Sequence, residues 1–323
     1  MKLSVAMCTY NGGRFLNEQI DSILHQTLKV DEIIVCDDIS TDDTLTILEE
    51  YSNKNPNLFK IYKNEINLKS VKNFEKAINL CSGEIIFLAD QDDVWANNKV
   101  KDYIKHFNHN LNINAIGSNG FCIDENSNVI DKYSLWDIPN FLKEQNIPYD
   151  YFRMITFFGN IFTGASMAFR KCIIPEVMPF PNVKNYHHDG WIATIAASKD
   201  EIVMLNDKYF YYRIHSKQQV GGVFFDKNEK QKDKLLHIYD IHQTKLSFYI
   251  LTKKLKKLSV SYNDKSKIIE EYPKYGPLFE NNKIEILDNY EKVKKNLKRK
   301  YPLRFFLLNI VDRIFDKRQI KVQ

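Results

Sequence analysis

Short apolar runs alternate with longer amphipathic stretches along roughly the first third of the chain. Apolar-rich runs that stop at polar or turn residues predict strands over residues 3–8, 32–36, 59–62 and 84–89. Apolar positions spaced three and four residues apart predict helices over residues 15–24, 44–51, 71–80 and 100–107. Strands and helices that alternate in this way build a mainly parallel sheet with flanking helices, so we expect an α/β fold.

The pattern changes in the rest of the chain. Residues 115–222 carry only short strand-like runs, and from Phe224 onward the sequence is lysine-rich with helical spacing. We therefore predict an α/β domain over residues 1–225 and a helical extension over residues 226–323. No apolar run approaches the 18 residues or so that a membrane span needs, and the N-terminal run is too short for a signal peptide, so we expect a cytoplasmic protein.

Charge is distributed unevenly along the chain. The formal net charge is only +5, which does not require a nucleic-acid partner, but basic clusters gather in the last quarter, notably at residues 294–300. Such a basic tail suits an anionic surface. The five cysteines include no C-x-x-C pair, which indicates small core residues in a reducing compartment rather than disulfides or a zinc site.

Polar groups follow three of the predicted strands. Thr9, Tyr10 and Asn11 follow the first strand, residues 37–38 the second and residues 90–93 the fourth. Ligands of open α/β sheets bind beyond the carboxyl ends of the strands. We therefore expect these three loops to line one crevice.

The loop after the fourth strand holds three aspartates, Asp90, Asp92 and Asp93. Carboxylates packed this closely repel one another unless a cation lies among them. Oxygen ligands suit Mg²⁺ or Mn²⁺, both of which also accept substrate phosphates as ligands. A solvated acidic turn, or a helix cap before Val94, is the alternative. The position at the end of a buried strand favours the metal site.

Three segments in this order resemble glycosyltransferase family 2. They are residues 4–12, residues 33–44 and residues 87–95, and the last is similar to the D-x-D region of the family's rhamnosyltransferase-like branch. The resemblance extends over about the first 220 residues. It implies a GT-A fold with a helical extension at its C-terminus, and inverting transfer of a sugar from a nucleoside diphosphate sugar.

The resemblance also implies roles for the first two loops. Thr9, Tyr10 and Asn11 would line the pocket for the base, and Asp38 would accept the N3–H of a uracil or thymine ring. One departure is Ile39, where the family often has glycine. Because isoleucine avoids positive φ, we expect an ordinary turn at this position.

Further roles fall on the acidic loop and on residues 212–222. By the family pattern Asp90 would contact the ribose or a metal-bound water, and Asp92 would ligate the metal. Tyr212–His215 resembles the family's R-x-H loop, in which Arg213 can bind a phosphate and His215 can complete the metal shell. A paired surface arginine and histidine is the alternative. Two glycines at 221–222 would let this loop close over the donor.

A carboxylate before a predicted helix over residues 192–197 suits the remaining task. Inverting transfer needs a general base that takes a proton from the attacking hydroxyl, and we assign Asp189 to it, as in similar family 2 enzymes. A plain helix cap is the alternative. His187 and His188 are adjacent and point in different directions, so we expect structural or acceptor-facing roles for them.

Other functional classes fit less well. A dinucleotide-binding oxidoreductase lacks its G-x-G-x-x-G after the first strand, and a non-catalytic relative would have lost carboxylates that are all present here. A metal-dependent nucleotidyltransferase acting on sugar phosphates is the alternative we retain. The branch resemblance favours dTDP-rhamnose as donor, with UDP-hexoses next, and a growing polysaccharide or lipid-linked glycan as acceptor.

Residues 301–315 predict one more helix, which begins at Pro302. Its apolar side chains share one face: Leu303, Phe306, Leu307, Ile310, Val311 and Ile314. Basic residues flank it, so it could lie on the inner face of an anionic membrane. In the alternative, this face packs on the main domain or on a second subunit of an oligomer.

Overall fold

The computed structural model describes residues 1–216, 224–240 and 246–320 of the chain. The described part divides into two compact units. The first unit comprises Met1–Asp137, Phe162–Phe180 and His187–Asp226, and the second comprises Ile138–Ile161, Pro181–Tyr186 and Lys227–Gln323. Two segments of the second unit thus precede residue 225. The division into a catalytic domain over 1–225 and an extension over 226–323 stays a prediction.

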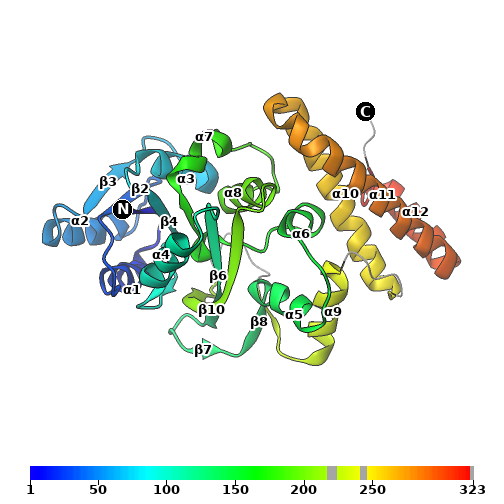
Figure 1. The fold of residues 1–323 in the computed structure, drawn as a ribbon, viewed down its shortest axis with the longest axis horizontal. Helices are drawn as coiled ribbons and strands as arrows, with labels where there is room; N and C mark the ends of the chain where they lie inside the picture. The colour runs from blue at the N-terminus through cyan, green and yellow to red at the C-terminus, as the bar shows by residue number, and fades with distance from the viewer. Residues whose placement is uncertain (217–223, 241–245, 321–323) are drawn as a thin grey trace. The chain divides into compact units, whose positions relative to one another are not determined.

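The first unit is built on a mixed sheet with the strand order β3-β2-β1-β4-β9-β6-β10-β5, with β7 paired to β6 (Figure 1). Its strands are β1 (Leu3–Thr9), β2 (Glu32–Asp37), β3 (Phe59–Lys63), β4 (Ile85–Ala89), β5 (Val94–Trp95), β6 (Ala115–Ile123), β7 (Val129–Ile130), β9 (Ala168–Arg170) and β10 (Ile202–Arg213). The four strands predicted near the N-terminus are confirmed. They pair in parallel around β1, which confirms the α/β class.

Strand register brings the three polar loops to one edge of this sheet. Thr9 pairs with Asp37 at the end of β1 and β2, and Met7 pairs with Ala89 at the end of β4. Because β1 lies between the two other strands and all three run in parallel, their carboxyl ends leave the sheet side by side. β1, β2 and β4 are almost wholly buried, so the sheet is a rigid base for these loops.

The helices that flank the sheet are α1 (Gly13–Leu24), α2 (Thr44–Lys54), α3 (Lys69–Leu80), α4 (Lys99–His109), α7 (Ile174–Val177) and α8 (His188–Ala197). The first four confirm the prediction from apolar spacing. α8 begins four residues before its predicted start, and α7 was not predicted. α1 buries Phe15, Leu16, Ile20 and Ile23, the positions that its periodicity indicates. α3 contacts β1, β2 and α8, so α3 and α8 lie on the same side of the sheet (Figure 1). A small two-stranded sheet joins β8 (Lys132–Ser134) to β11 (Phe224–Asp226).

The second unit is helical. It contains α5 (Ile138–Glu144), α6 (Tyr151–Phe158), α9 (Glu229–Tyr239), α10 (Phe248–Glu271), α11 (Gly276–Lys300) and α12 (Pro302–Phe315). Side chains cap three of these helices, since Asp150, Asn228 and Ser247 accept backbone N–H groups of α6, α9 and α10. α10 packs along α11, and α12 packs on α11. None of the described helices has the length and apolar character needed to cross a membrane.

Candidate active site

The loop after β1 is tied to the loop after β4 by a reciprocal pair of hydrogen bonds. The backbone N–H of Tyr10 donates to Oε1 of Gln91 at 2.8 Å, and Nε2 of Gln91 donates to the carbonyl of Tyr10 at 3.1 Å. A Cβ at Gly12 would lie 2.2 Å from Oε1 of Gln91, so only glycine leaves room for this side chain. The tie leaves the ring of Tyr10 exposed at the edge of the sheet.

The rest of the first loop packs against the loop after β2. Thr9 is buried, and its hydroxyl donates to Asp37 at 2.7 Å. Asn11 has a φ of +49°, receives the N–H of Thr41 on its side-chain oxygen at 2.8 Å, and donates its own N–H to Ser40 at 2.9 Å. The three residues predicted for the base pocket therefore lie together, and the predicted contact with a base stays a prediction.

Asp38 is buried and its carboxylate is already hydrogen-bonded. Oδ1 accepts from Nδ2 of Asn64 at 2.8 Å and from the N–H of Leu68 at 2.7 Å, and Oδ2 accepts the N–H of Lys69 at 2.9 Å. The carboxylate thus holds the segment that leads from β3 into α3. An oxygen with one donor keeps a free lone pair, so Oδ2 can accept a further N–H.

The expectation of an ordinary turn at Ile39 is wrong. Its φ is +62°, in the left-handed region that costs a residue with a Cβ about 1–2 kcal/mol. The neighbouring aspartates explain the strain. Asp38 is held by the segment before α3, while Asp37 accepts the N–H of Ser40 at 2.9 Å and its hydroxyl at 2.6 Å, which closes the turn tightly around Ile39.

The aspartates after β4 lie in a different environment. Burial, together with the charges of Asp92 and Asp189, raises the pKa of Asp90 to about 7. Burial and the charges of Asp92 and Asp90 raise the pKa of Asp93 well above its usual range. Oδ2 of Asp93 is buried and has no hydrogen-bond partner in the described structure. The loop therefore concentrates negative charge that its own hydrogen bonds do not balance.

The two residues predicted to hold a metal lie side by side. Nε2 of His215 is 2.9 Å from Oδ2 of Asp92, and the ring of His215 packs 5.1 Å from that of Phe15. The Asp92 side chain is 22% exposed, so the pair is open to solvent. One carboxylate and one imidazole suit Mn²⁺ or Mg²⁺ when phosphates and water supply the other ligands. Within the described residues, no three His, Cys, Asp or Glu side chains form a metal site without such help.

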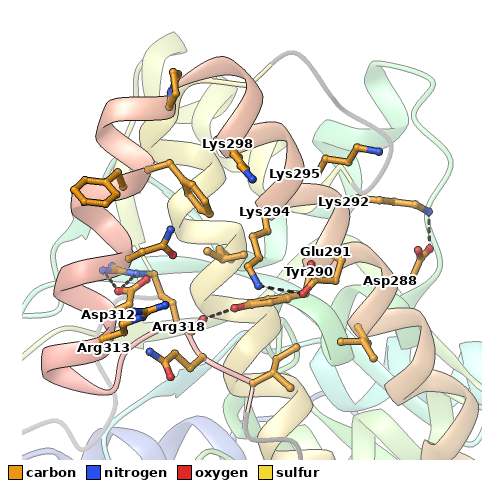
Figure 2. A pocket seen from close by; sticks show the side chains of 18 residues that line it. Asp288, Tyr290, Glu291, Lys292, Lys294, Lys295, Lys298, Asp312, Arg313 and Arg318 are labelled. Carbon is orange, nitrogen blue, oxygen red and sulfur yellow. Dashed lines mark hydrogen bonds and ion pairs between the residues drawn. The ribbon is translucent and has the colours of Figure 1, made fainter.

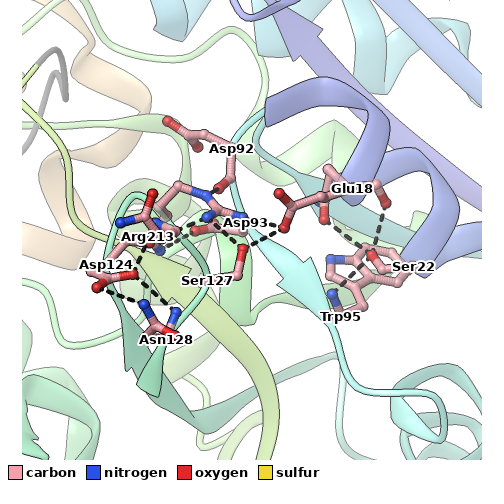
Figure 3. Close-up of polar contacts among 11 residues, drawn as sticks. Glu18, Ser22, Asp92, Asp93, Trp95, Asp124, Ser127, Asn128 and Arg213 are labelled. Atoms are coloured by element: carbon pink, nitrogen blue, oxygen red, sulfur yellow. Dashed lines mark hydrogen bonds and ion pairs between the residues drawn. The ribbon is translucent and has the colours of Figure 1, made fainter. Parts of the chain in front are cut away.

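Arg213 is fully buried beneath this loop (Figure 3). Its Nε donates to the carbonyl of Asp92 at 2.8 Å, and its backbone N–H donates to Oδ1 of Asp93 at 3.0 Å. The side chain therefore supports the backbone that carries the acidic cluster. The N-terminal neighbour on the same strand, Tyr212, also faces this charge, because the carboxylates add to burial in raising its pKa.

The other nitrogens of Arg213 are bound to protein groups as well. Nη1 donates to Ser127 at 2.9 Å and to the carbonyl of Asp124 at 3.2 Å, and Nη2 forms an ion pair with Glu18 at 2.8 Å (Figure 3). The guanidinium also lies over the ring of Phe15. These contacts leave the predicted phosphate contact without support from the structure, because each guanidinium nitrogen already has an acceptor.

Asp189 lies in the first turn of α8, and His187 is the residue that precedes the helix. The carboxylate accepts the N–H of Gly164 on Oδ2 at 2.9 Å and the N–H of Gly190 on Oδ1 at 2.6 Å. The side chain is half-buried. These contacts fix the direction of the carboxylate, and they leave lone pairs free on both oxygens.

Gly164 marks the point where the predicted base approaches the acidic loop. A Cβ at this position would lie 3.2 Å from Nε2 of His188 and 3.3 Å from Oδ2 of Asp90. Its backbone N–H is also bound to Asp189. Asp90, His188 and Asp189, which come from two distant segments, thus lie close around one glycine.

His188 is buried beside Gly164 with its ring stacked on Phe74, at 3.7 Å between ring centroids. Neither ring nitrogen has a hydrogen-bond partner in the described structure. Burial lowers the pKa of His188 to about 4, so the imidazole is neutral at physiological pH. A neutral ring offers one donor and one acceptor, which suits contact with a hydroxyl.

Lys99 is a buried residue that sequence reasoning missed. Its Nζ donates to the carbonyl of Ala165 at 2.6 Å and lies 4.1 Å from the centre of the Trp95 ring. Burial lowers the pKa of Lys99 to about 7, while Asp93 and Asp90 oppose that shift. No pattern in the sequence distinguishes it from the solvated lysines that commonly begin helices. The glycines predicted to close the R-x-H loop, at 221–222, lie outside the described residues.

The family model for glycosyl transferase family 2 matches residues 4–170, which is more than half of the 323-residue chain. The chain belongs to glycosyl transferase family 2.

Curated relatives of this family 2 chain are glycosyltransferases of several kinds. A dTDP-rhamnosyl transferase of Shigella flexneri, RfbG, is 29% identical over 229 residues, which cover 67% of this chain and 74% of that protein. Uncharacterized glycosyltransferases of Nostoc and of Methanocaldococcus jannaschii are each 28% identical, over 67% and 60% of this chain. The chain covers just under two thirds of these last two proteins, at 65% and 64% of their lengths.

Solved structures with the same fold cover nearly all of this family 2 chain. S. aureus TarS in complex with UDP-GlcNAc aligns with a TM-score of 0.54 and 19% identity, over 93% of this chain and 92% of that one. The mannosyltransferase PcManGT from Pyrobaculum calidifontis, in complex with GDP-Man and Mn²⁺, aligns with a TM-score of 0.52 and 14% identity, over 97% of this chain and 79% of that one. At these identities the likeness shows the fold, which is the GT-A type that the resemblance implied.

Proposed function

We propose that this family 2 protein is an inverting glycosyltransferase that moves a sugar from a nucleoside diphosphate sugar to an acceptor hydroxyl. The observation that carries the proposal is the meeting of three groups at one edge of the sheet. The Asp92–His215 pair, the crowded carboxylate of Asp90 and the oriented carboxylate of Asp189 lie on loops that converge there. A metal-stabilised leaving group and a general base are the two parts that such a transfer requires.

The nucleotide would bind over the loops after β1 and β2. Thr9, Tyr10 and Asn11 would line the pocket for the base, with the exposed ring of Tyr10 available for stacking. Asp38 would accept the N3–H of a uracil or thymine ring on Oδ2, the oxygen that accepts one N–H in the structure. Asp90 would contact the ribose or a metal-bound water.

Asp92 and His215 would hold a divalent cation, Mg²⁺ or Mn²⁺. When bound there, the cation would neutralise the charge that grows on the departing diphosphate. Arg213 holds the backbone of Asp92 and Asp93 from below, so we assign it to the support of this site rather than to a phosphate. This support would keep the side chains of Asp92 and His215 directed toward the same cation.

Asp189 would act as the general base. Its carboxylate would take the proton of the acceptor hydroxyl as the hydroxyl oxygen attacks the anomeric carbon, while the bond to the nucleoside diphosphate breaks. A single displacement of this kind inverts the configuration of that carbon and forms no covalent intermediate. The N–H groups of Gly164 and Gly190 would hold the carboxylate in the orientation that this step needs.

For the donor we propose dTDP-rhamnose, with a UDP-hexose as the next candidate. The relative RfbG is named a dTDP-rhamnosyl transferase and aligns over two thirds of this chain, whereas TarS was solved with UDP-GlcNAc. The acceptor would be a growing cell-surface polysaccharide or a lipid-linked glycan. Such an acceptor would place the protein in the cytoplasm at the inner face of the membrane.

A panel of nucleotide sugars tests the proposal. A donor that binds the folded state raises its thermal stability, so we expect dTDP- or UDP-sugars to raise Tm, and to do so more strongly with Mn²⁺ or Mg²⁺ than with EDTA. The same donors should be hydrolysed slowly with release of the nucleoside diphosphate when Mn²⁺ is present. Release of pyrophosphate from a nucleoside triphosphate and a sugar phosphate would instead show a nucleotidyltransferase and overturn the proposal.

A further inference from the structure

The last helix of the chain, α12, is fixed to α11 along one side (Figure 2). Phe305 is buried on that side, and the buried Asp312 forms an ion pair with Arg318 and accepts from its Nε at 2.7 Å. The hydroxyl of Tyr290 on α11 donates to the carbonyl of Arg318 at 2.7 Å. These contacts hold α12 in one rotational setting, and that setting decides which of its faces is turned outward.

The outward face of α12 is apolar. Five large side chains on it are exposed: Leu303 by 82%, Phe306 by 64%, Leu307 by 61%, Ile310 by 42% and Ile314 by 69%. Each residue of an α-helix is rotated by about 100° from the one before, so these five form a single stripe on the side opposite Phe305 and Asp312. We call this set the apolar stripe. Contiguous exposed apolar area of this kind marks an interaction surface.

Cations lie along both edges of the apolar stripe. By the same rotation, Arg304 and Arg313 fall on its two opposite edges. Residues 298–300 form a basic cluster before the helix, and Lys317 follows it. An apolar stripe between rows of cations is the arrangement of helices that lie in the interface of an anionic membrane.

A groove of about 1100 Å³ between α11 and α12 continues this surface. Lys295 and Lys298 from α11 and Arg313 from α12 line it, as Figure 2 shows, and Phe305 is also among its lining residues. The three cations are exposed and form no ion pair within the described residues, unlike Lys292 and Lys294, which pair with acids of α11. The groove therefore offers unneutralised positive charge beside apolar side chains.

We propose that α12 docks this protein on an anionic lipid surface. The apolar stripe would enter the boundary between headgroups and acyl chains, and Lys295, Lys298 and Arg313 would contact lipid phosphates. The inference rests on the proposed function in one respect: docking would bring the protein to a lipid-linked acceptor. A second copy of this chain is a poorer occupant, because a symmetric contact through the stripe would set the bordering cations against their own counterparts.

Co-sedimentation of the full-length protein with vesicles tests the proposal. We expect the protein to sediment with vesicles that contain phosphatidylglycerol at low salt, to be released as salt rises, and to remain in the supernatant with phosphatidylcholine alone. Failure to sediment with the anionic vesicles at low salt would overturn it. The thermal shift with a nucleotide sugar is read on the same sample, so a failed membrane proposal and a failed donor proposal are told apart.

Matched variants assign the binding to the stripe and the groove. The double variant Phe306→Glu/Ile314→Glu should bind anionic vesicles at least about tenfold more weakly, because two inserted apolar side chains are lost. Ile284→Glu places one such charge on an exposed apolar residue of α11, 64% exposed, and should bind like the wild type. Equal losses in the two variants would overturn the assignment to the stripe.

The cations of the groove have their own control. Lys295→Gln/Lys298→Gln should weaken binding to anionic vesicles several-fold and make it less sensitive to salt. Lys101→Gln/Lys105→Gln removes the same charge from exposed positions of α4 and should have less effect. If the stripe variant instead changes the sedimentation coefficient of a protein that never binds vesicles, the stripe joins two copies of the chain and the lipid proposal is wrong.

Discussion

The two acidic loops that flank β1 look alike in sequence and differ in structure. After β2, Asp37 and Asp38 each accept three hydrogen bonds from protein donors that hold the surrounding turns. After β4, Asp90 and Asp93 have raised pKa values, and one oxygen of Asp93 has no partner in the described structure. The first loop is internally satisfied, whereas the second concentrates charge for which the fold supplies few donors.

The two pairs of carboxylates therefore differ in how far protein donors compensate their burial. A buried carboxylate with enough donors stabilises the backbone around it. A cluster without them costs stability, and a fold retains it where another component supplies the compensation. On the proposed function, a bound cation would balance the charge of the loop after β4, whereas the carboxylates of the loop after β2 are already held by protein donors.

Asp92→Asn should have the largest effect on activity and little on stability. We expect transfer to fall by about 10³-fold or more, because the pair with His215 loses its charged ligand. The free energy of unfolding should be unchanged or higher, since the charge of Asp92 raises the pKa values of Asp90 and Asp93. Transfer assays with and without EDTA, together with urea unfolding, check both parts. Full activity of the wild type in EDTA would show that transfer needs no metal.

Lys99→Met should have the largest effect on stability. It leaves Asp90 and Asp93 without the buried cation beside them and the carbonyl of Ala165 without its donor. Removing one partner from buried charges costs about 3–5 kcal/mol in the free energy of unfolding. Lys101→Met, at an exposed position of the same helix, is the control and should change it by less than about 0.5 kcal/mol. Similar losses in both variants would show that Lys99 is not the counter-charge.

Asp38→Asn should lower the free energy of unfolding by about 1–3 kcal/mol. All three recorded donors to this carboxylate are N–H groups, so an amide must turn its own NH₂ toward one of them. The same substitution is thus destabilising after β2 and harmless to stability after β4. Urea unfolding of both variants measures the difference between their free energies of unfolding. Equal values for Asp38→Asn and Asp92→Asn would contradict the prediction.

His188→Phe should change the pH dependence of stability, with the smallest effect of the set. Burial lowers the pKa of His188 to about 4, so between about pH 6.5 and pH 5.5 the unfolded chain binds a proton here that the folded chain does not. The wild type should lose about 1 kcal/mol over this range through His188, and the variant should not. The control is His187→Phe at the exposed neighbouring position. Its free energy of unfolding should change with pH as that of the wild type does.

Local pattern was enough to predict the first four strands, the helices that alternate with them and the three loops, because each depends on the spacing of apolar residues within one segment. The family resemblance, and not local pattern, assigned Asp92 and His215 to one metal site and Asp189 to the role of base, and these roles stay predictions. The turn at Ile39, the burial of Arg213 and the position of Lys99 were not accessible in this way. Each depends on donors or acceptors from segments that lie far away in the chain, such as Asn64, Glu18 and Ala165.

The central claim is that Asp189 is the base of a site whose donor pocket lies on other loops. The most direct test is to measure donor affinity and the rate of transfer at saturation for Asp189→Asn beside the wild type. We expect donor affinity within a few-fold of the wild type and a rate lower by about 10²-fold or more. A variant that loses donor binding but keeps its rate at saturation would contradict the claim.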